Sequence, residues 1–146
     1  MPVSIEIRRA KTGDNKRVYE LVCQLENSTL NEKYLNDVFK RNLSSETVFY
    51  WVIETDKHVF GFISMHIQDL LHHEGRVAEV QELCVDENYR NNGFGKILLD
   101  HALTEAKKQN CELIEVAANR KREDAHRFYE KNGWERSHFK FTRKLK

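Results

Sequence analysis

The chain has 146 residues, and its 24 Lys and Arg nearly balance 23 Asp and Glu, giving a formal net charge of +1. The length predicts one domain, residues 1–146, and the near-neutral charge disfavours a globally basic nucleic-acid binder. The 40% hydrophobic content supports a buried core, but no apolar run approaches the roughly 18 residues of a membrane span. The three cysteines lack metal-ligand spacing and the chain starts without a signal-peptide pattern, so we expect a cytoplasmic protein with no membrane partner.

The first half of the chain predicts one strand, two helices and three further strands. Residues 3–8 alternate apolar and polar side chains, as a half-buried strand does. Apolar residues at helical spacing then predict a helix entered near Thr12 or Asp14 and a second one opened by Asn31. Runs rich in β-branched and aromatic residues predict three strands joined as hairpins. These strands are expected at 49–54, 59–69 and 76–85.

The second half alternates helices and strands. A helix of about sixteen residues follows the glycine-rich turn at 93–95, and a strand follows at 112–118. A short helix over 123–132 ends at Gly133, and residues 134–145 are expected to add one or two last strands. The succession of a strand, a helix and a strand around Gly93 indicates two parallel strands joined by a crossover connection. The whole pattern predicts a mixed α/β sheet with helices on both faces.

The turn between the fourth strand and its helix is the most informative segment. It reads Arg90-Asn91-Asn92-Gly93-Phe94-Gly95-Lys96. The first turn of a helix presents unpaired N–H groups and the positive end of the dipole, so this turn could hold a diphosphate. Its spacing fits neither a Walker loop nor the dinucleotide fingerprint, and leaves Arg-x-x-Gly-x-Gly. The alternative is that the glycines merely begin a helix.

This pattern resembles the pyrophosphate motif (Gln/Arg)-x-x-Gly-x-(Gly/Ala) of the GCN5-related N-acetyltransferase (GNAT) superfamily. Further stretches are similar to that family along the whole chain: Ile7-Arg8-Arg9-Ala10, Leu83-Cys84-Val85, Phe128-Tyr129 and Asn132-Gly133-Trp134. A narrower similarity is to the aminoalkylphosphonate N-acetyltransferases. It is carried by stretches such as His72-His73, Gln81-Glu82-Leu83 and Asp124-Ala125-His126-Arg127-Phe128-Tyr129.

The resemblance implies a mixed, mostly antiparallel sheet of six to seven strands, flanked by about four helices and splayed between strands four and five. It also implies that acetyl-CoA lies in the splay, held largely by main-chain groups. A bulge in the fourth strand would free an amide for the thioester carbonyl. The implied cofactor-binding residues are Leu83, Cys84, Val85, Arg90, Asn91, Asn92, Gly93, Phe94, Gly95, Lys96, Asn119 and Phe128.

The resemblance further implies direct attack of an amine on the thioester. An alkylamine is protonated at neutral pH, so a base must take its proton, and Glu79 occupies the position of the family's glutamate. Glu82 lies three residues on and would face the other side of the sheet unless a bulge intervenes. Tyr129 matches the family's general acid. The alternatives are a solvated carboxylate for Glu79 and an amphipathic core tyrosine for Tyr129.

Histidines and Glu82 are candidates for the acceptor side of the site. We expect the acceptor pocket to draw on Glu82, His66, His73 and His138. The adjacent pair His72-His73 would be a poor chelate on a strand, because neighbouring side chains point to opposite faces, so no metal is expected.

The predicted function is acetyl-CoA-dependent N-acetylation of a small-molecule primary amine, with an aminoalkylphosphonate as the favoured acceptor. The alternatives are a free amino acid or another small amine, a protein N-acetyltransferase, and a non-catalytic coenzyme A sensor on the same fold. Family members often dimerise through their last strands, so the resemblance allows a homodimer.

Overall fold

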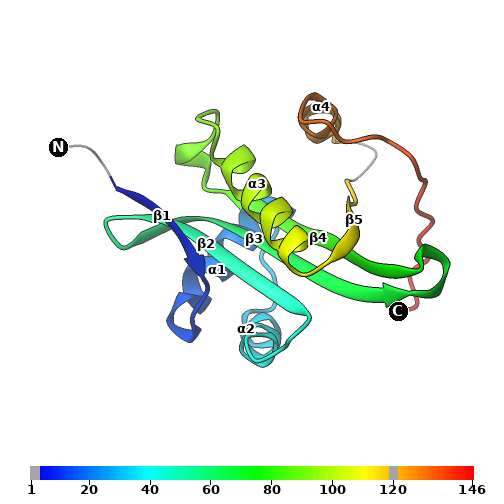
Figure 1. Ribbon diagram of the computed structural model, residues 1–146. Coiled ribbons are helices and arrows are strands. Elements are labelled where there is room, and N and C mark those ends of the chain that lie inside the picture. The colour runs from blue at the N-terminus through cyan, green and yellow to red at the C-terminus, as the bar shows by residue number, and fades with distance from the viewer. Residues whose placement is uncertain (1–3, 119–121) are drawn as a thin grey trace. The chain divides into compact units, whose positions relative to one another are not determined.

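The structure is a computed structural model that describes residues 4–118 and 122–146 (Figure 1). The chain divides into two compact units, residues 1–115 and 116–146, and each is described by itself.

The first unit is built on a five-stranded sheet in the order β1-β2-β3-β4-β5. Its strands are β1 (Ile5–Arg9), β2 (Val48–Thr55), β3 (His58–Leu70), β4 (Gly75–Val85) and β5 (Cys111–Val116), the last of which ends on the first residue of the second unit. Its helices are α1 (Asn15–Glu26), α2 (Glu32–Asn42) and α3 (Phe94–Lys108). Short 3₁₀ helices cover Thr12–Asp14, Leu71–His73 and Glu87–Tyr89.

The pairings β1–β2, β2–β3 and β3–β4 are antiparallel, and the last two confirm the predicted hairpins. β5 lies beside β4 at the edge of the sheet. A Cβ placed on Gly75 would lie 2.7 Å from Glu112 Cγ, and Arg76 donates to the Gln109 carbonyl at 2.9 Å. The beginnings of β4 and β5 are therefore neighbours, so these strands run in the same direction, as a crossover through α3 requires.

The expected count of six to seven strands is wrong, because the described residues form five. Residues 134–146 were to supply the missing strands, but they are neither helix nor strand, and residues 135–146 are exposed. A strand needs a neighbour that satisfies its backbone groups. Phe139 and Phe141 of this segment are exposed, and no strand of the described residues pairs with them. The expected four helices are present in the described residues, the fourth being α4 (Glu123–Lys131) in the second unit.

Helices cover both faces of the sheet, as predicted (Figure 1). Side chains that alternate along a strand point to opposite faces. One set, including Tyr50 and Phe62, packs with Val18, Leu21 and Phe39 of α1 and α2, and we call this the α1–α2 face. The next residue along β2 points the other way: the Trp51 ring meets the His101 ring of α3 edge-on, with centroids 5.1 Å apart, and we call this the α3 face.

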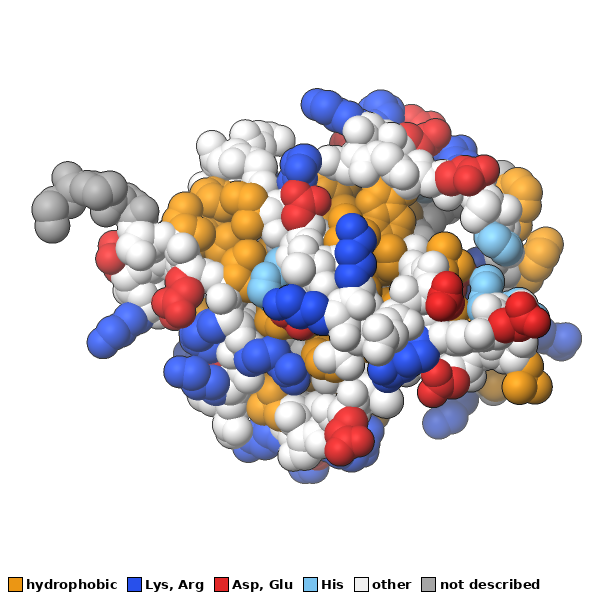
Figure 2. All heavy atoms as spheres, viewed as in Figure 1, with side chains coloured by type: hydrophobic (Ala, Val, Ile, Leu, Met, Phe, Trp, Pro, Cys, Tyr) orange, Lys and Arg blue, Asp and Glu red, His pale blue; other side chains and the backbone are white. Residues whose placement is uncertain are grey.

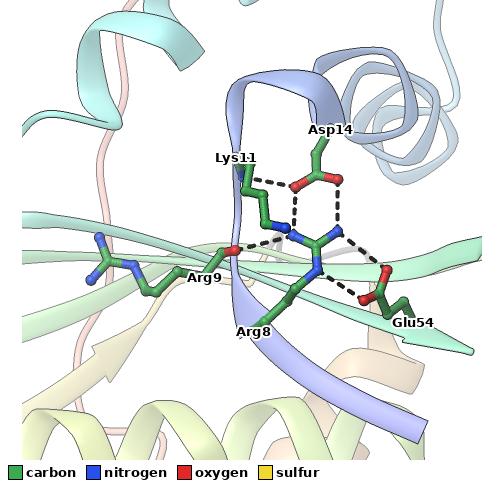
Figure 3. A network of polar contacts seen from close by, with 5 residues as sticks. All are labelled: Arg8, Arg9, Lys11, Asp14 and Glu54. Atoms are coloured by element: carbon green, nitrogen blue, oxygen red, sulfur yellow. Dashed lines mark hydrogen bonds and ion pairs between the residues drawn. The ribbon is translucent and has the colours of Figure 1, made fainter. Parts of the chain in front are cut away.

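An ion-pair network joins the first strand to its neighbour and to the entry of α1 (Figure 3). The Arg8 guanidinium donates to both Asp14 carboxylate oxygens, at 2.8 and 3.0 Å, and to both Glu54 oxygens, at 2.9 and 3.2 Å. The Lys11 amide also donates to Asp14 at 2.7 Å. Burial of Asp14 opposes its ionisation, but the hydrogen bonds from Arg8 and Lys11 outweigh burial and hold its pKa below the ordinary value.

Lys and Arg side chains lie beside Asp and Glu side chains over much of the face in view, with apolar side chains between them (Figure 2). Among the described residues, no helix has both the length and the apolar character needed to cross a membrane.

Candidate active site

The predicted diphosphate turn forms the entrance to α3. Gly93 is the N-cap of α3 with φ 82°, a left-handed conformation that favours glycine, and a Cβ there would meet no atom within 4 Å. The Ile97 amide donates to the Gly93 carbonyl at 3.2 Å, so the helix begins as an ordinary α-helix. Its first turn contains no acidic residue. Backbone amides at this end can therefore bind an anion, with open space in front of Gly93.

A buried carboxylate anchors this turn to α1. Asp86 is 6% exposed, its amide donates to the Phe60 carbonyl at 2.8 Å, and its side chain lies 3.0 Å from Arg17 Nη2. Burial opposes ionisation of Asp86, but the Asn88 amide and the Arg17 guanidinium outweigh it and lower the pKa of the carboxyl. Arg17 also donates to the Val59 carbonyl at 2.9 Å. The residues that lead into the turn are thus tied to both α1 and β3.

Aromatic rings fix the same turn from the core. The fully buried Phe60 stacks on Tyr89, with ring centroids 4.4 Å apart, and meets Phe94 edge-on at 4.8 Å. Arg90 Nε donates to the Val85 carbonyl at 3.0 Å, and the Asn92 side chain donates to the Arg90 carbonyl, also at 3.0 Å. The turn is held on both sides of Gly93 by contacts within the first unit.

The other residues predicted to bind the cofactor take different positions. Lys96 is exposed and pairs with Asp100 at 2.7 Å. Leu83 and Val85 pair with Ile63 and Gly61 of β3 and point to the α3 face. Cys84 is buried within the apolar cluster of the α1–α2 face. Asn91 adopts a positive φ of 65°, Gly95 lies in the first turn of α3, and Asn119 lies outside the described residues.

The predicted bulge is present in β4. Met65 pairs with Val80 and Ser64 pairs with Glu82, so Gln81 is an extra residue with no partner in β3. Because side chains alternate, the extra residue brings Glu79 and Glu82 to the same face of the sheet although they are three positions apart. The bulge that Glu82 needs in order to share a face with Glu79 is therefore present.

Three polar side chains form a row across β2, β3 and β4 on the α1–α2 face, which we call the Glu82 row. Tyr50 pairs with Ser64, and Ser64 pairs with Glu82. The Glu82 amide donates to Ser64 Oγ at 2.9 Å, and Ser64 Oγ donates to Glu82 Oε1. Ser64 is 0% exposed. A buried hydroxyl thus joins the main chain and the carboxylate of one residue.

The Tyr50 hydroxyl at the other end of this row accepts a hydrogen bond from the Asn42 side chain at 2.8 Å. Burial raises the pKa of Tyr50, the Asn42 hydrogen bond and nearby Arg41 lower it, and the Glu82 charge raises it, with a net upward shift. The Tyr50 hydroxyl therefore lies within electrostatic reach of a negative charge, on Glu82, and of a positive charge, on the exposed Arg41.

A second row places a histidine beside the other acid. Val48 pairs with His66, and His66 pairs with Glu79, on the same α1–α2 face. Gln81 Nε2 donates to Glu79 Oε1 at 2.6 Å in an exposed position. His66 and Glu82 thus share a face, whereas His73 lies in the 3₁₀ helix that joins β3 to β4 and contacts His72. No group of three potential metal ligands is found in the described part of the chain.

The second unit carries the remaining predicted residues. Tyr129 lies in α4, and its ring meets Phe128 edge-on at 5.3 Å and Trp134 at 5.8 Å. The Trp134 amide donates to the Tyr129 carbonyl at 3.0 Å. His138 follows in the extended C-terminal segment, where its Nδ1 lies 2.6 Å from Ser137 Oγ.

Reasoning from the sequence missed Ser64, Tyr50, Asn42 and Arg41. Ser64 stands in an apolar strand, where a serine gives no signal by itself. Its partner Glu82 is 18 positions away, and only the register across the bulge brings the two together. Tyr50 and Arg41 belong to no recognisable sequence motif.

Comparison with known proteins decides the family. Residues 15–134 match the family described as "Acetyltransferase (GNAT) family". This chain is a GNAT N-acetyltransferase. It is 41% identical over 145 residues to the aminoalkylphosphonate N-acetyltransferase of Salmonella typhimurium, across 99% of this chain and 94% of that protein.

Solved structures share the GNAT fold. A transcriptional regulator from Bacillus halodurans superposes with a TM-score of 0.89 at 21% identity, covering 97% of this chain and 100% of that one. The aminoglycoside N-acetyltransferase AAC(6')-Iy in complex with CoA superposes with a TM-score of 0.88 at 15% identity, covering 99% and 97%. The family's acetyl donor is acetyl-CoA, and one structural neighbour of this GNAT chain was solved with CoA.

Proposed function

We propose that this protein transfers an acetyl group from acetyl-CoA to the primary amine of a small aminoalkylphosphonate. The observation that supports the acceptor is the 41% identity, over nearly the full length of both chains, to the Salmonella aminoalkylphosphonate N-acetyltransferase. The family match includes residues of both units, so we also propose that residues 1–146 act as a single domain.

The proposed cofactor site uses the turn at the start of α3. Amides at Phe94, Gly95 and Lys96 would bind the pyrophosphate, with Arg90 at the rim. Main-chain groups of Leu83 and Val85 would pair with the pantetheine arm at a proposed splay between β4 and β5. The Glu82 amide is bonded to Ser64, so we propose another amide of β4 as the donor to the thioester carbonyl. Asn119 and Phe128 are further proposed contacts.

The proposed reaction is direct transfer. A carboxylate of β4 removes a proton from the ammonium group, and the nitrogen lone pair attacks the thioester carbonyl carbon to give a tetrahedral oxyanion. The oxyanion collapses, the C–S bond breaks, and the thiolate of coenzyme A takes a proton from the Tyr129 hydroxyl. The products are the N-acetylated acceptor and free coenzyme A.

The charges on the α1–α2 face suit an acceptor that carries a positive and a negative group. Glu82 and Glu79 can attract the ammonium group, and Arg41, whose charge acts on the Tyr50 hydroxyl, can attract the phosphonate. His66 lies beside Glu79 and would line the same pocket. We propose His73 and His138 as further acceptor contacts.

The test is release of free thiol from acetyl-CoA with a panel of aminoalkylphosphonates, amino acids, other small amines and peptides. The proposal expects the highest kcat/KM with an aminoalkylphosphonate. Turnover of peptides alone would refute the small-molecule acceptor. Tight acetyl-CoA binding without turnover of any amine would instead indicate a coenzyme A sensor.

A further inference from the structure

We infer that Glu82, rather than Glu79, takes the proton from the acceptor amine, and that Ser64 is the residue that positions it. This inference rests on the proposed acetyl transfer, and it selects between two carboxylates on the same face of β4. It makes Glu82 a catalytic residue and Ser64 a positioning residue.

The first reason is the attachment of Glu82. Ser64 accepts from the Glu82 amide at 2.9 Å and donates to Glu82 Oε1, so one buried hydroxyl holds the residue at two points. Ser64 is fully buried at the centre of the sheet, so its position is fixed by β2 and β4 on either side. A carboxylate fastened in this way loses little freedom when an amine arrives, which favours proton transfer in a defined direction.

The second reason is that Ser64 binds only one of the two carboxylate oxygens of Glu82, so the other oxygen can accept a proton. Ser64 occupies Oε1, and within the residues that the structure describes Oε2 accepts no hydrogen bond. An ammonium group can donate to Oε2 and transfer its proton there. The nitrogen is then neutral and can attack the thioester, while the proton remains on Glu82 until it exchanges with solvent.

The third reason is the different setting of Glu79. Its Oε1 accepts from Gln81 Nε2 at 2.6 Å in an exposed position, so the side-chain amide of an exposed residue is its described partner. Gln81 is itself the bulged residue, which has no partner in β3. Glu79 is therefore held less firmly than Glu82.

Several ionisable groups face Glu82 on the α1–α2 face. Tyr50 adjoins Ser64, its hydroxyl is fixed by Asn42, and its raised pKa keeps it protonated at neutral pH. His66 and Glu79 lie in the neighbouring row, and Arg41 lies near Tyr50. None of these groups bonds to Glu82 Oε2 in the described structure, so an entering amine meets this oxygen directly.

The deciding experiment compares Glu82→Gln and Glu79→Gln over pH with one aminoalkylphosphonate. At about pH 7 nearly all of an alkylamine is protonated, because its pKa is about 10, so removal of the base should reduce kcat/KM by roughly 10²-fold or more. At about pH 9.5 far more amine is already neutral, and the deficit of Glu82→Gln should shrink by at least tenfold. A merely structural defect would not be rescued by raising the pH.

Ser64 is tested by a double-mutant cycle. Ser64→Ala alone should lower kcat, with little change in the Kd of acetyl-CoA. In the Glu82→Gln background the same change should have no further effect, because Ser64 acts through Glu82. Ser45→Ala, at a serine in the loop before β2, is the matched serine control, and Glu26→Gln, at the exposed end of α1, is the matched glutamate control; both should retain parental activity.

Each possible outcome either supports or overturns the assignment of Glu82 as the base. If the parent enzyme turns over no amine, the proposed function fails and the inference fails with it. If the parent is active but Glu79→Gln shows the larger, pH-rescued loss, Glu79 is the base and the inference alone is overturned. Additive effects of Ser64→Ala and Glu82→Gln would refute the positioning role. Should Glu82→Gln fail to fold, the Ser64→Ala variant decides: unchanged kcat would overturn the inference.

Discussion

Arg17 Nη2 of α1 lies 3.0 Å from Asp86 Oδ2, at the point where β4 passes into the turn before α3. Asp86 is buried, and the pKa of its carboxyl lies below the ordinary value. Arg17 thus connects the packing of α1 to the turn that should hold the cofactor diphosphate.

Replacing Arg17 with Met should leave the buried Asp86 carboxylate without its cationic partner. We expect the free energy of unfolding to fall by about 1–3 kcal/mol and the Kd of acetyl-CoA to rise. Urea unfolding and calorimetric titration measure the two effects. Lys33→Met removes the exposed Lys33–Asp37 pair, whose side chains are 87% and 62% exposed, and should change neither. Equal effects of the two substitutions would contradict the anchoring role of Arg17.

Gly93 offers a second test of the same turn. Alanine at its φ of 82° is strained, so Gly93→Ala should lower stability by about 1–2 kcal/mol and weaken acetyl-CoA binding. A Cβ on Gly13 would also meet no atom within 4 Å, but Gly13 has no left-handed φ, so Gly13→Ala is the matched control and should be nearly neutral. Undiminished acetyl-CoA binding by Gly93→Ala would argue against the diphosphate site.

The Asp14 ion pair predicts a pH dependence of stability. The folded-state pKa of Asp14 is lowered, so its contribution is present above the unfolded value of about 3.9 and is lost as pH falls through the folded value. Asp14→Asn should therefore be less stable than the parent at pH 7, and the two should converge below about pH 4 in urea unfolding. Asp37→Asn, in an exposed pair, should show little difference at any pH. A constant difference for Asp14→Asn over the pH range would contradict this account.

Tyr129→Phe tests the proposed general acid. Loss of the hydroxyl should reduce kcat by roughly 10²–10⁴-fold, because the leaving thiolate loses its proton donor, while the Kd of acetyl-CoA stays the same. The ring contacts with Phe128 and Trp134 are kept by phenylalanine. Tyr34→Phe, at a tyrosine that is 71% exposed, is the control. Parental turnover by Tyr129→Phe would show that another group, or water, protonates the sulfur.

The sequence predicts the order of elements well because each one has its own local signal. Alternation marks β1, apolar spacing marks α1 and α2, and the glycines mark the entrance to α3. Residues 134–145 were expected to add one or two strands, yet residues 134–146 form none, because a sequence segment does not show whether a neighbouring strand is there to pair with it.

The site is harder to predict because it depends on register. The Arg-x-x-Gly-x-Gly turn could be recognised from one segment. The pairing of Ser64 with Glu82 depends on one extra residue, Gln81, in β4, and nothing in the local sequence marks that residue. From the sequence alone, Glu82 could be placed on the same face as Glu79 only if β4 contained a bulge. The register between β3 and β4 shows that bulge.

The most direct test of the central proposal compares two primary amines, one of which carries a phosphonate where the other carries a hydroxyl. With acetyl-CoA, aminoethylphosphonate should be acetylated with a kcat/KM at least roughly tenfold above that of ethanolamine, a difference that corresponds to about 1.4 kcal/mol. Arg41→Met should reduce this preference mainly through the KM of the phosphonate. Equal rates for the two amines in the parent enzyme, or no acetylated phosphonate by mass spectrometry, would contradict the proposed acceptor.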